Sequence, residues 1–471
     1  MDVDATDNAA VSFVQFPDLD GVATLWTRSP SNGLDTTPSG PAVPPTLYQM
    51  TYSWAVGAVS PGTVTAFARD SSANTTNVNF TVIGDGLGPT STLDYLDGPN
   101  KNNSVAISFL PADAGSGLST WQLQRRTASY SSGNCTGWSA WSNLGAAKIA
   151  SPYSDSPLTD ATCYEYRISA TDNVGNNSLI SIAKTVKVDK TAPSASLSGY
   201  NEMGNPSTKH TVGNTLYFNP LFAGNSAVVL DGSDASSGIA RVEFPNGPDL
   251  TWNTPGTVDS PPYSGEYNWS IGATSFGTRN AAMYDNAGNV SNVAFTVLSD
   301  ADPPSGSSVS YADASISSTH VSVSFGVGVD AVTGIAQSRL QRQQASYHGG
   351  NCGEFSDWSS IDSINPSSPV TDSQLADDTC YRYRLEVRDN VDNIEYATSE
   401  SIVKVDLTNF SYPIGYRPSS SIPITIDAGS YGSADIAGWQ LQRRFASYSL
   451  DSCDTYSDWA DLGAPNVDGI Y

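Results

Sequence analysis

The sequence predicts an all-β chain built from tandem β-sandwich modules. Short stretches that alternate apolar and polar residues recur along the chain and are separated by Gly, Pro, Asn, Asp and Ser. This is the pattern of half-buried strands joined by turns. No window shows a convincing 3.6-residue periodicity, so long helices are not expected. Segments also repeat at fixed offsets, which indicates an array of modules, and 471 residues have room for three to five of them.

One repeated segment defines a module type that we call B. The segment Leu-Gln-Arg-Arg or Leu-Gln-Arg-Gln, followed by Ala-Ser-Tyr, begins at Leu123, Leu340 and Leu441. The first two copies stay 217 residues apart through both of their cysteines, so these two modules have no net insertion relative to each other. The third copy follows the second by 101 residues, which is one module length.

A cysteine-free type, called A, lies before and between the first two B modules. Its marks are a Phe-Pro pair at Phe16 and Phe244, and an Asp-x-x-x-Asn turn followed by Phe-Thr-Val at Asp70 and Asp285. The junctions between modules consist of few residues and carry Pro, Gly or Asp, so we do not expect them to be flexible linkers. Both ends of the array look incomplete, because the first A lacks a counterpart of residues 196–230 and the third B stops before a second cysteine. The predicted order is A (1–88), B (89–193), A (194–303), B (304–408) and B (409–471).

Three segments of the first B module alternate as strands, at 105–109, 121–125 and 164–170. In the third segment we expect Tyr164, Tyr166 and Ile168 to point into the core, and Glu165 and Arg167 to point to solvent.

These residues carry a family resemblance. The last part of the first B module resembles the end of a fibronectin type III module, in which the first tyrosine makes the corner between two sheets. The resemblance rests on Leu158, which lies six residues before Tyr164, on the Tyr-x-Tyr-Arg-Ile-x-Ala strand and on the turn after that strand. Leu375 and Tyr381 match in the second B module. The Asp-Asn-x-Gly-Asn turn at 172–176, followed by Val-Asp-Lys-Thr-Ala-Pro, is also similar to tandem Ig-like modules of prokaryotic cell-surface proteins of the adhesin, stalk or filament type. The resemblance implies Ig-like and fibronectin III-like sandwiches of two alternating types, and it specifies architecture far better than ligand.

The cysteines predict disulfides, although fibronectin-type modules usually lack one. Within each complete B module the two cysteines are 28 residues apart. This spacing predicts the pairs Cys135–Cys163 and Cys352–Cys380, and it gives Cys453 no partner within the sequence. Such a loop closure stabilises by about 3–4 kcal/mol and implies an oxidising, extracellular or cell-surface location. Because Cys163 alternates with Tyr164, we expect it on the solvent side, where the bridge would hold the hairpin 130–141 over the exterior of the sheet. The spacing does not suit zinc.

The composition limits the partners of the chain. It has 22 Lys and Arg against 47 Asp and Glu, a formal net charge of −25. Nucleic acid and anionic lipid need a positive surface, so neither is expected as a partner. No run of 18 apolar residues and no signal-peptide pattern occurs, so no membrane span is expected in this segment, and a signal or anchor would lie outside it.

Calcium is the one cofactor that the sequence suggests. Asp- and Asn-rich turns at 70–74, 172–176, 285–289 and 389–393 lie near module ends, and calcium prefers six to eight oxygen ligands. The alternative is that Asp, Asn and Gly only provide the turn geometry. In the second B module Asp392 replaces Gly175, which adds an acid but loses a glycine. The candidate ligands are Asp85, Asp172, Asp189, Asp285, Asp300, Asp302, Asp389 and Asp406.

No catalytic site is predicted. The three histidines, His210, His320 and His348, lie in different modules, and no nucleophile, nucleotide or metalloprotease motif occurs. We therefore expect that the chain is not an enzyme.

Aromatic residues and sequons are weaker candidates. Trp138 and Trp141 either form an exposed platform for a sugar or cover the sheet, and exposed, coplanar rings would favour the sugar. The paired Arg125 and Arg126 are expected to contact local acids. Glycans would be attached only in an exported protein of a suitable organism, and the acceptor sequons are at Asn74, Asn79, Asn102, Asn134, Asn176, Asn268, Asn289 and Asn409.

The sequence thus favours a structural repeat segment of an extracellular stalk, filament or surface-layer protein that acts as a rigid spacer or assembly unit. Its partner would be another copy, another surface protein or a glycan. Two alternatives stay open: a ligand- or carbohydrate-binding adhesin array, and an accessory region of a large secreted enzyme.

Overall fold

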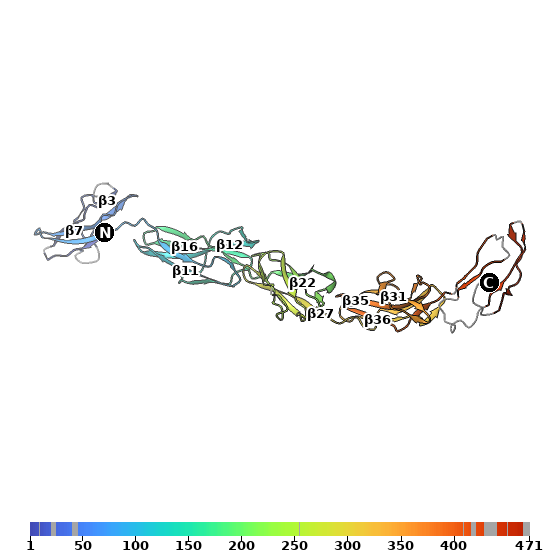
Figure 1. Cartoon of the computed structure of the whole chain (residues 1–471). Coiled ribbons are helices and arrows are strands. Elements are labelled where there is room, and N and C mark those ends of the chain that lie inside the picture. Colours follow the sequence, from blue (N-terminus) through green and yellow to red (C-terminus); the bar gives the residue numbers. More distant parts are fainter. Residues whose placement is uncertain are drawn as a thin grey trace. The chain divides into compact units, whose positions relative to one another are not determined.

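The computed structural model describes residues 1–471 except 9, 20–24, 40–45, 254, 408, 416–420, 428–439, 450 and 465–471. Within these ranges the regular structure is strand, apart from the short 3-10 helix η1 (Pro206–Thr208), which confirms the all-β class (Figure 1). Among the described residues, no helix is long and apolar enough to cross a membrane. The chain divides into two compact units, which are described separately; the first is essentially Met1–Thr191, and the second holds most of the remainder.

The first unit begins with the first A module. A four-stranded sheet has the order β4-β2-β7-β8, and β1-β5 and β3-β6 form two further pairs. The core of the module is small and consists of Val14, Phe16, Tyr48, Met50 and Ala66. The strands are β1 (Asp2–Asp4), β2 (Val11–Gln15), β3 (Trp26–Ser29), β4 (Leu34–Asp35), β5 (Leu47–Gln49), β6 (Thr51–Trp54), β7 (Gly62–Asp70) and β8 (Thr75–Val82).

The first B module is a sandwich of two sheets. One sheet has the order β10-β18-β16-β12-β13, with β14 beside β12 and β17 beside β16, and the other has the order β15-β11-β9. The strands are β9 (Thr90–Asp94), β10 (Gly98–Asn100), β11 (Val105–Ala112), β12 (Leu118–Ser131), β13 (Asn134–Thr136), β14 (Ser142–Asn143), β15 (Tyr153–Asp155), β16 (Thr162–Asp172), β17 (Asn177–Ser181) and β18 (Val186–Val188).

Strand β16 shows why this sequence makes a sandwich. Tyr164, Tyr166 and Ile168 alternate into the core and are buried, as predicted. The Tyr164 hydroxyl accepts a hydrogen bond from the backbone N–H of Thr159 at 2.7 Å, and Tyr381 does the same with Ala376 at 2.8 Å. This is the tyrosine corner of an Ig-like, fibronectin III-like module, and it confirms the predicted β-sandwich fold of the two B modules.

An ion pair between a partly exposed arginine and a buried aspartate stabilises the same core. Arg125 donates to both oxygens of Asp155 at 2.8 and 2.9 Å, and the Tyr166 hydroxyl donates to Asp155 at 2.8 Å. Arg342, Asp372 and Tyr383 repeat the arrangement in the second B module. A paired buried carboxylate is tolerated where an isolated one is not, because its hydrogen-bonding capacity is filled.

The second unit begins with the second A module. Its larger sheet has the order β20-β21-β27-β26-β23-β24, in which β21 is parallel to β27, and its smaller sheet has the order β19-β22-β25. Aromatic rings of Phe218, Trp252, Trp269, Phe276 and Phe295 pack in the core between them. The strands are β19 (Ser194–Met203), β20 (Lys209–Val212), β21 (Thr215–Phe218), β22 (Gly224–Ser233), β23 (Ile239–Glu243), β24 (Thr257–Val258), β25 (Tyr263–Trp269), β26 (Gly277–Asp285) and β27 (Val290–Ser299).

The second B module repeats the strand order of the first. Its sheets have the orders β29-β37-β35-β31-β32 and β28-β30-β34, with β33 beside β31 and β36 beside β35. The strands are β28 (Ser308–Ser310), β29 (Ala314–Ile316), β30 (Val321–Gly326), β31 (Ile335–His348), β32 (Asn351–Cys352), β33 (Ser359–Ser360), β34 (Val370–Asp372), β35 (Thr379–Asp389), β36 (Ile394–Thr398) and β37 (Val403–Val405).

The described residues after the second B module form three two-stranded pairs, β38-β39, β40-β43 and β41-β42. Thr408, at the predicted boundary, lies outside the described residues. The strands are β38 (Asn409–Ser411), β39 (Thr425–Asp427), β40 (Gln442–Arg443), β41 (Tyr448–Ser449), β42 (Ser452–Cys453) and β43 (Ala460–Asp461).

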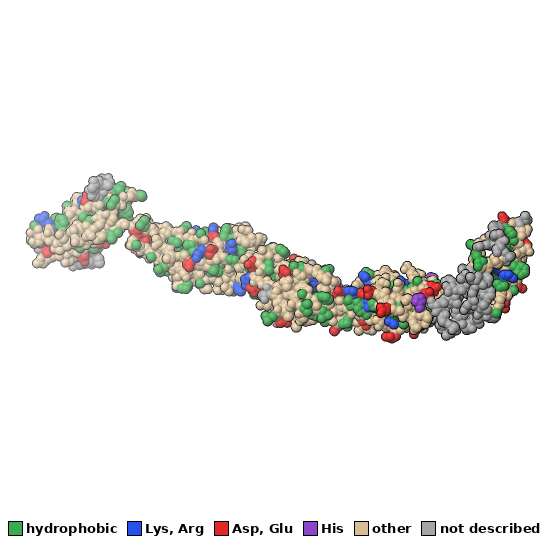
Figure 2. Space-filling model, in the orientation of Figure 1, with side chains coloured by type: hydrophobic (Ala, Val, Ile, Leu, Met, Phe, Trp, Pro, Cys, Tyr) green, Lys and Arg blue, Asp and Glu red, His purple; other side chains and the backbone are tan. Residues whose placement is uncertain are grey.

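Charged side chains do not gather into one patch on the visible face. Figure 2 shows Asp, Glu, Lys and Arg scattered among polar and apolar side chains along the described part of that face. The acidic excess is therefore spread out there, and any concentrated charge has to be sought in local clusters.

Candidate metal centres at the module junctions

The Asp-x-x-x-Asn turns have the same geometry in four modules. In each, the backbone N–H of the asparagine donates to Oδ1 of the aspartate at 2.8 Å, and the asparagine side chain donates to Oδ2 at 2.7 Å. These aspartates therefore have a structural role in the turn. Oδ2 accepts the one side-chain N–H of the asparagine in these turns and has a second lone pair, so the turn does not exclude a further ligand at Oδ2. The turns span 70–74, 172–176, 285–289 and 389–393.

A second loop brings an aspartate that the sequence prediction missed. Asp113 Oδ1 accepts hydrogen bonds from the N–H groups of Gly115 at 3.1 Å and Gly117 at 2.7 Å. Asp330 Oδ1 likewise accepts from Thr333 at 2.7 Å and Gly334 at 2.6 Å. The shared pattern Asp-Ala-x-Ser/Thr-Gly recurs at the same 217-residue offset as the cysteines, and that recurrence could have identified both aspartates.

A third aspartate lies in the segment that connects each A module to the B module after it. Asp85 accepts hydrogen bonds from the N–H groups of Ser116 at 2.6 Å and Leu87 at 3.1 Å. Its backbone carbonyl accepts the side-chain N–H of Asn176 at 3.1 Å. The same asparagine that closes the turn on Asp172 therefore also holds the connecting segment.

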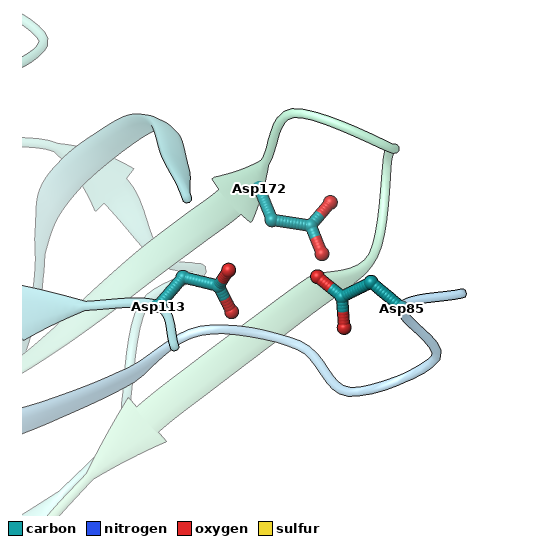
Figure 3. A group of neighbouring side chains, drawn as sticks. All are labelled: Asp85, Asp113 and Asp172. Atoms are coloured by element: carbon teal, nitrogen blue, oxygen red, sulfur yellow. The ribbon is translucent and has the colours of Figure 1, made fainter. Parts of the chain in front are cut away.

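The first cluster is defined by Asp85, Asp113 and Asp172, all in the first unit. One oxygen of each lies within 4.8 Å of the other two. Figure 3 shows the three carboxylates facing one another from three separate segments of the chain. Carboxylates at this separation repel one another unless protons, N–H groups or a cation balance their charge.

The second cluster is defined by Asp300, Asp330 and Asp389, all in the second unit, and its three oxygens also lie within 4.8 Å of one another. Asp300 accepts a hydrogen bond from the Thr333 hydroxyl at 2.8 Å, and its carbonyl accepts the side-chain N–H of Asn393 at 3.1 Å. The three positions and the bridging asparagine therefore repeat those of the first cluster.

The second cluster is covered more completely than the first. Asn219, from the second A module, donates to the Val391 carbonyl at 3.0 Å and to Oδ1 of Asn393 at 2.7 Å. Val391 is fully buried, whereas its counterpart Val174 is 60% exposed. Water therefore reaches the turn of the second cluster less easily.

The pKa values of Asp85 and Asp172 in the first cluster and of Asp300 and Asp389 in the second shift in opposite directions. The N–H of Ser116 lowers the pKa of Asp85, and at Asp172 the hydrogen bonds from Asn176 and the turn outweigh burial, so that its pKa is also lowered. Burial raises the pKa of Asp300, and burial together with the charge of Asp300 raises the pKa of Asp389. Desolvation therefore dominates in the second cluster and hydrogen bonding in the first.

A third group of carboxylates, Asp377, Asp378 and Asp406, lies within the second unit with the same mutual distance limit. Asp377 accepts hydrogen bonds from the N–H groups of Leu407 at 2.6 Å and Asp378 at 2.9 Å. Asp406, a predicted ligand, is fully buried in this group.

The remaining predicted ligands are placed as follows. Asp302 is exposed, and only its backbone N–H contacts Asp300, at 3.2 Å, so its side chain is not part of the second cluster. Asp189 and Asp285 are both buried. The extra acid Asp392, at a φ of 70°, contacts Arg388 at 2.7 Å and belongs to an ion pair.

The structure joins Cys135 to Cys163 and Cys352 to Cys380, the pairs that the 28-residue spacing predicts, and Cys453 is an exposed free thiol. The expectation that Cys163 faces solvent is wrong, because its side chain is fully buried. It packs with Ala128 and Tyr130, and Cys135 and Trp138 lie against them, in a small cluster separate from the main core. The bridge does attach the hairpin to the sheet outside that core.

The aromatic residues of the B modules are stacked with arginines. The guanidinium of Arg126 lies 4.7 Å from the ring centre of Trp138 and 4.9 Å from that of Trp141, and Arg167 lies 4.4 Å from Trp141. Both tryptophans are half-buried. Arg126 also pairs with Glu165, as expected for a local acid. The second and third B modules repeat the stacking with Arg382 over Phe355, Arg384 over Trp358 and Arg444 over Tyr456 and Trp459.

The sequon asparagines differ in exposure. Asn176 and Asn289 are half-buried, and their amide nitrogens, like that of the exposed Asn74, already donate to a turn aspartate. The side chain of Asn409 lies outside the described residues. The remaining acceptors, all exposed, are Asn79, Asn102, Asn134 and Asn268.

Comparisons with known proteins find structural likenesses only. No protein-family model matches the chain, and no curated protein matches it. The chain is similar to fibronectin(III)-like modules of Clostridium thermocellum CbhA, at 15% identity and a TM-score of 0.24, over 45% of this chain and 95% of that one. It is similar to a tetra-tandem repeat from the extending region of a large adhesion protein, at 16% identity and a TM-score of 0.27, over 84% and 93%. It is similar to the FN1–FN3 domains of chicken CNTN1, at 14% identity and a TM-score of 0.22, over 67% and 98%.

Proposed function

We propose that this chain is a structural repeat segment of an extracellular protein of the adhesin or stalk type, in which the A-to-B junctions act as stiff spacers. One observation carries the proposal. In each unit the turn asparagine donates to the carbonyl of the connecting segment, from Asn176 to Asp85 at 3.1 Å and from Asn393 to Asp300 at 3.1 Å. A connecting segment that is hydrogen-bonded to the next module has few alternative conformations, which is the property that a spacer needs.

The two disulfides support an oxidising compartment, and therefore an extracellular location for this segment. The arginines over Trp138 and Trp141 favour a structural role for these rings, since a sugar would have to compete with the guanidinium groups for the ring faces.

The stiffness of a junction is tested by distance measurement within one unit. Fluorophores are attached at Val56→Cys in the first A module and Leu179→Cys in the first B module, both exposed positions, after Cys453→Ser removes the free thiol. We expect one narrow distance distribution by single-molecule energy transfer, and a broader one after Asn176→Ala. A broad distribution in the parent chain would mean that the junction is a flexible linker.

The proposal includes calcium at the first and second clusters. Asp85, Asp113 and Asp172 would hold one ion, and Asp300, Asp330 and Asp389 another. Each set supplies several carboxylate oxygens, the donors that calcium prefers, and a divalent cation would balance charges that otherwise repel. An ion bound only by the folded state stabilises it by about 2.7 kcal/mol at a hundred times its Kd.

Calorimetric melting of the full chain in calcium and in EDTA tests this part. We expect calcium to raise the melting temperatures, and Asp113→Asn with Asp330→Asn to remove most of that increase, because an amide keeps the loop acceptor but loses the charge. Asp357→Asn, an exposed position of the second B module outside the clusters, is the matched control and should respond like the parent chain. Equal melting in calcium and EDTA would eliminate calcium and leave the hydrogen-bonded spacer intact.

A further inference from the structure

The sequence contains two Asn-Gly pairs, one in each A module, and the structure restrains them differently. They are Asn32-Gly33 and Asn246-Gly247. Such a pair can rearrange without an enzyme, because the backbone nitrogen of the glycine can attack the side-chain carbonyl carbon of the asparagine and no Cβ blocks its approach. The attack requires that the asparagine side chain and the glycine N–H are free to meet.

Hydrogen bonds hold both reacting groups of the first pair. The Gly33 N–H donates to the Pro30 carbonyl at 3.0 Å, and the Asn32 side-chain oxygen accepts the N–H of Leu34 at 3.1 Å. The Gly33 carbonyl also accepts the N–H of Phe16 at 2.8 Å. Attack by the Gly33 nitrogen therefore has to break the first two of these hydrogen bonds.

The second pair has no comparable restraint. Within the part of the chain that the structure describes, neither the Asn246 side chain nor the Gly247 N–H makes a hydrogen bond, and Asn246 is exposed to water. Gly247 is required by packing, because a Cβ at this position would lie 2.1 Å from the Cβ of Trp252, a residue of the module core. The fold therefore places a glycine directly after an unrestrained asparagine.

We propose that Asn246 is a site of spontaneous deamidation in the folded chain. The Gly247 nitrogen passes its proton to solvent and bonds to Cγ of Asn246, and the amide nitrogen takes up a proton and leaves as ammonia, so that a succinimide ring forms. Water then adds to one of the two ring carbonyls and opens the ring, which gives aspartate or isoaspartate. Each product adds a negative charge, and isoaspartate also lengthens the backbone by one carbon atom. This modification does not depend on the spacer role proposed above.

The lengthened backbone would lie between two buried anchors. Phe244 and Trp252 are 5% and 7% exposed, and the Tyr267 hydroxyl donates to the Pro245 carbonyl at 2.7 Å. A segment held at both ends accepts an extra backbone atom only if an anchor moves in the close-packed core, so isoaspartate should destabilise the second A module. Aspartate keeps the backbone length at an exposed position and should change the stability little.

Ageing of the full chain at neutral pH, followed by peptide mass spectrometry with detection of isoaspartate, tests the proposal. We expect products at position 246 to accumulate at least about tenfold faster than at position 32, because two hydrogen bonds must break at the first pair. In concentrated urea, which removes the restraint, the two rates should approach each other. Asn246→Ser is the control variant, since serine cannot form the ring and the change removes no hydrogen bond of the described structure; this loop should then stay unmodified.

Absence of product at position 246 in the folded chain, or equal rates at positions 246 and 32, would overturn the proposal. A rate ratio that is the same in buffer and in urea would contradict it as well, because the folded structure would then not control the reaction. Asn246→Asp isolates the effect of the added charge. Aged parent chain should melt at a lower temperature than this variant, and equal melting of chains rich in isoaspartate would show that the anchors do not restrain the loop.

Discussion

The first and second clusters take their carboxylates from the same three places, and yet their surroundings differ. Each has an aspartate from the connecting segment, one from an Asp-Ala-x-Ser/Thr-Gly loop and one from an Asp-x-x-x-Asn turn. In the first cluster the turn is open to water at Val174, and in the second Asn219 and Val391 close it. The ligand set is therefore repeated along the chain while its solvation is not.

The two clusters therefore differ in what stabilises or destabilises the charge of their carboxylates. Hydrogen bonds from N–H groups stabilise the ionised carboxylates of Asp85 and Asp172 in the first cluster, so these two side chains stay charged without a bound cation. In the second cluster burial destabilises the charge of Asp300 and Asp389, so a bound cation would relieve a larger penalty. A cation should therefore matter more to the second junction, which is also the one held by more hydrogen bonds.

The largest expected effect comes from removing the buried bridging asparagine. Asn393→Ala removes the side-chain donor of the Asp300 carbonyl and of Asp389 Oδ2 and one of the two acceptors of the Asn219 amide, all in a buried site, at a cost of about 3 kcal/mol in the free energy of unfolding. Asn176→Ala, the matched change in the half-buried first junction, should cost about 1 kcal/mol because water replaces the lost contacts. Differential scanning calorimetry in EDTA measures both. Equal losses of unfolding free energy in the two variants would show that the greater burial of the second cluster does not stabilise its junction.

Much of this fold could be predicted from local patterns. The alternation in β16 predicted the burial of Tyr164, Tyr166 and Ile168, and the leucine six residues earlier predicted the tyrosine corner. The burial of Cys163 could not be predicted in the same way. Alternation places a side chain on the outer side of a sheet, but it does not show that Tyr130 and Trp138 then cover that side.

The candidate site was predicted less completely than the fold. The turn and connecting-segment aspartates stood out by composition, whereas Asp113 and Asp330 are visible only when the repeats are compared with each other. Asn219 and Asn393 are 174 residues apart, and no pattern in the sequence links them. Their contact exists because two modules meet, which is information that a local motif does not contain.

An exchange at the turn should have a smaller effect than loss of the asparagine. Gly175 has a φ of 97°, and a side chain there would meet open space, so Gly175→Asp adds only backbone strain, of about 1 kcal/mol. Asp392→Gly relieves the corresponding strain in the second B module but removes the ion pair with Arg388, so its net effect should stay within about 0.5 kcal/mol. Urea denaturation of each variant, with the other module as internal reference, checks the asymmetry. A stabilising Gly175→Asp would show that the added carboxylate, and not the backbone, decides the outcome.

The smallest expected effect is a divergent response of the two junctions to pH in EDTA. Asp300 and Asp389 have folded-state pKa values raised above the ordinary 3.8, so their ionisation opposes folding, and lowering the pH from neutral towards 4 should stabilise the second junction. Asp85 and Asp172 have lowered pKa values, so the stability that they contribute is fully present over this range and is lost only below it, as the pH falls through their folded-state values.

Hydrogen exchange of amides in the two turns, compared at pH 7 and pH 5 after correction for the intrinsic rates, should show added protection at 389–393 and none at 172–176. Asp330→Asn should reduce the added protection, because the charge of Asp330 is one of the causes that raise the pKa of Asp300. Parallel behaviour of the two turns would mean that burial around Asn219 and Val391 does not control how the second cluster is charged.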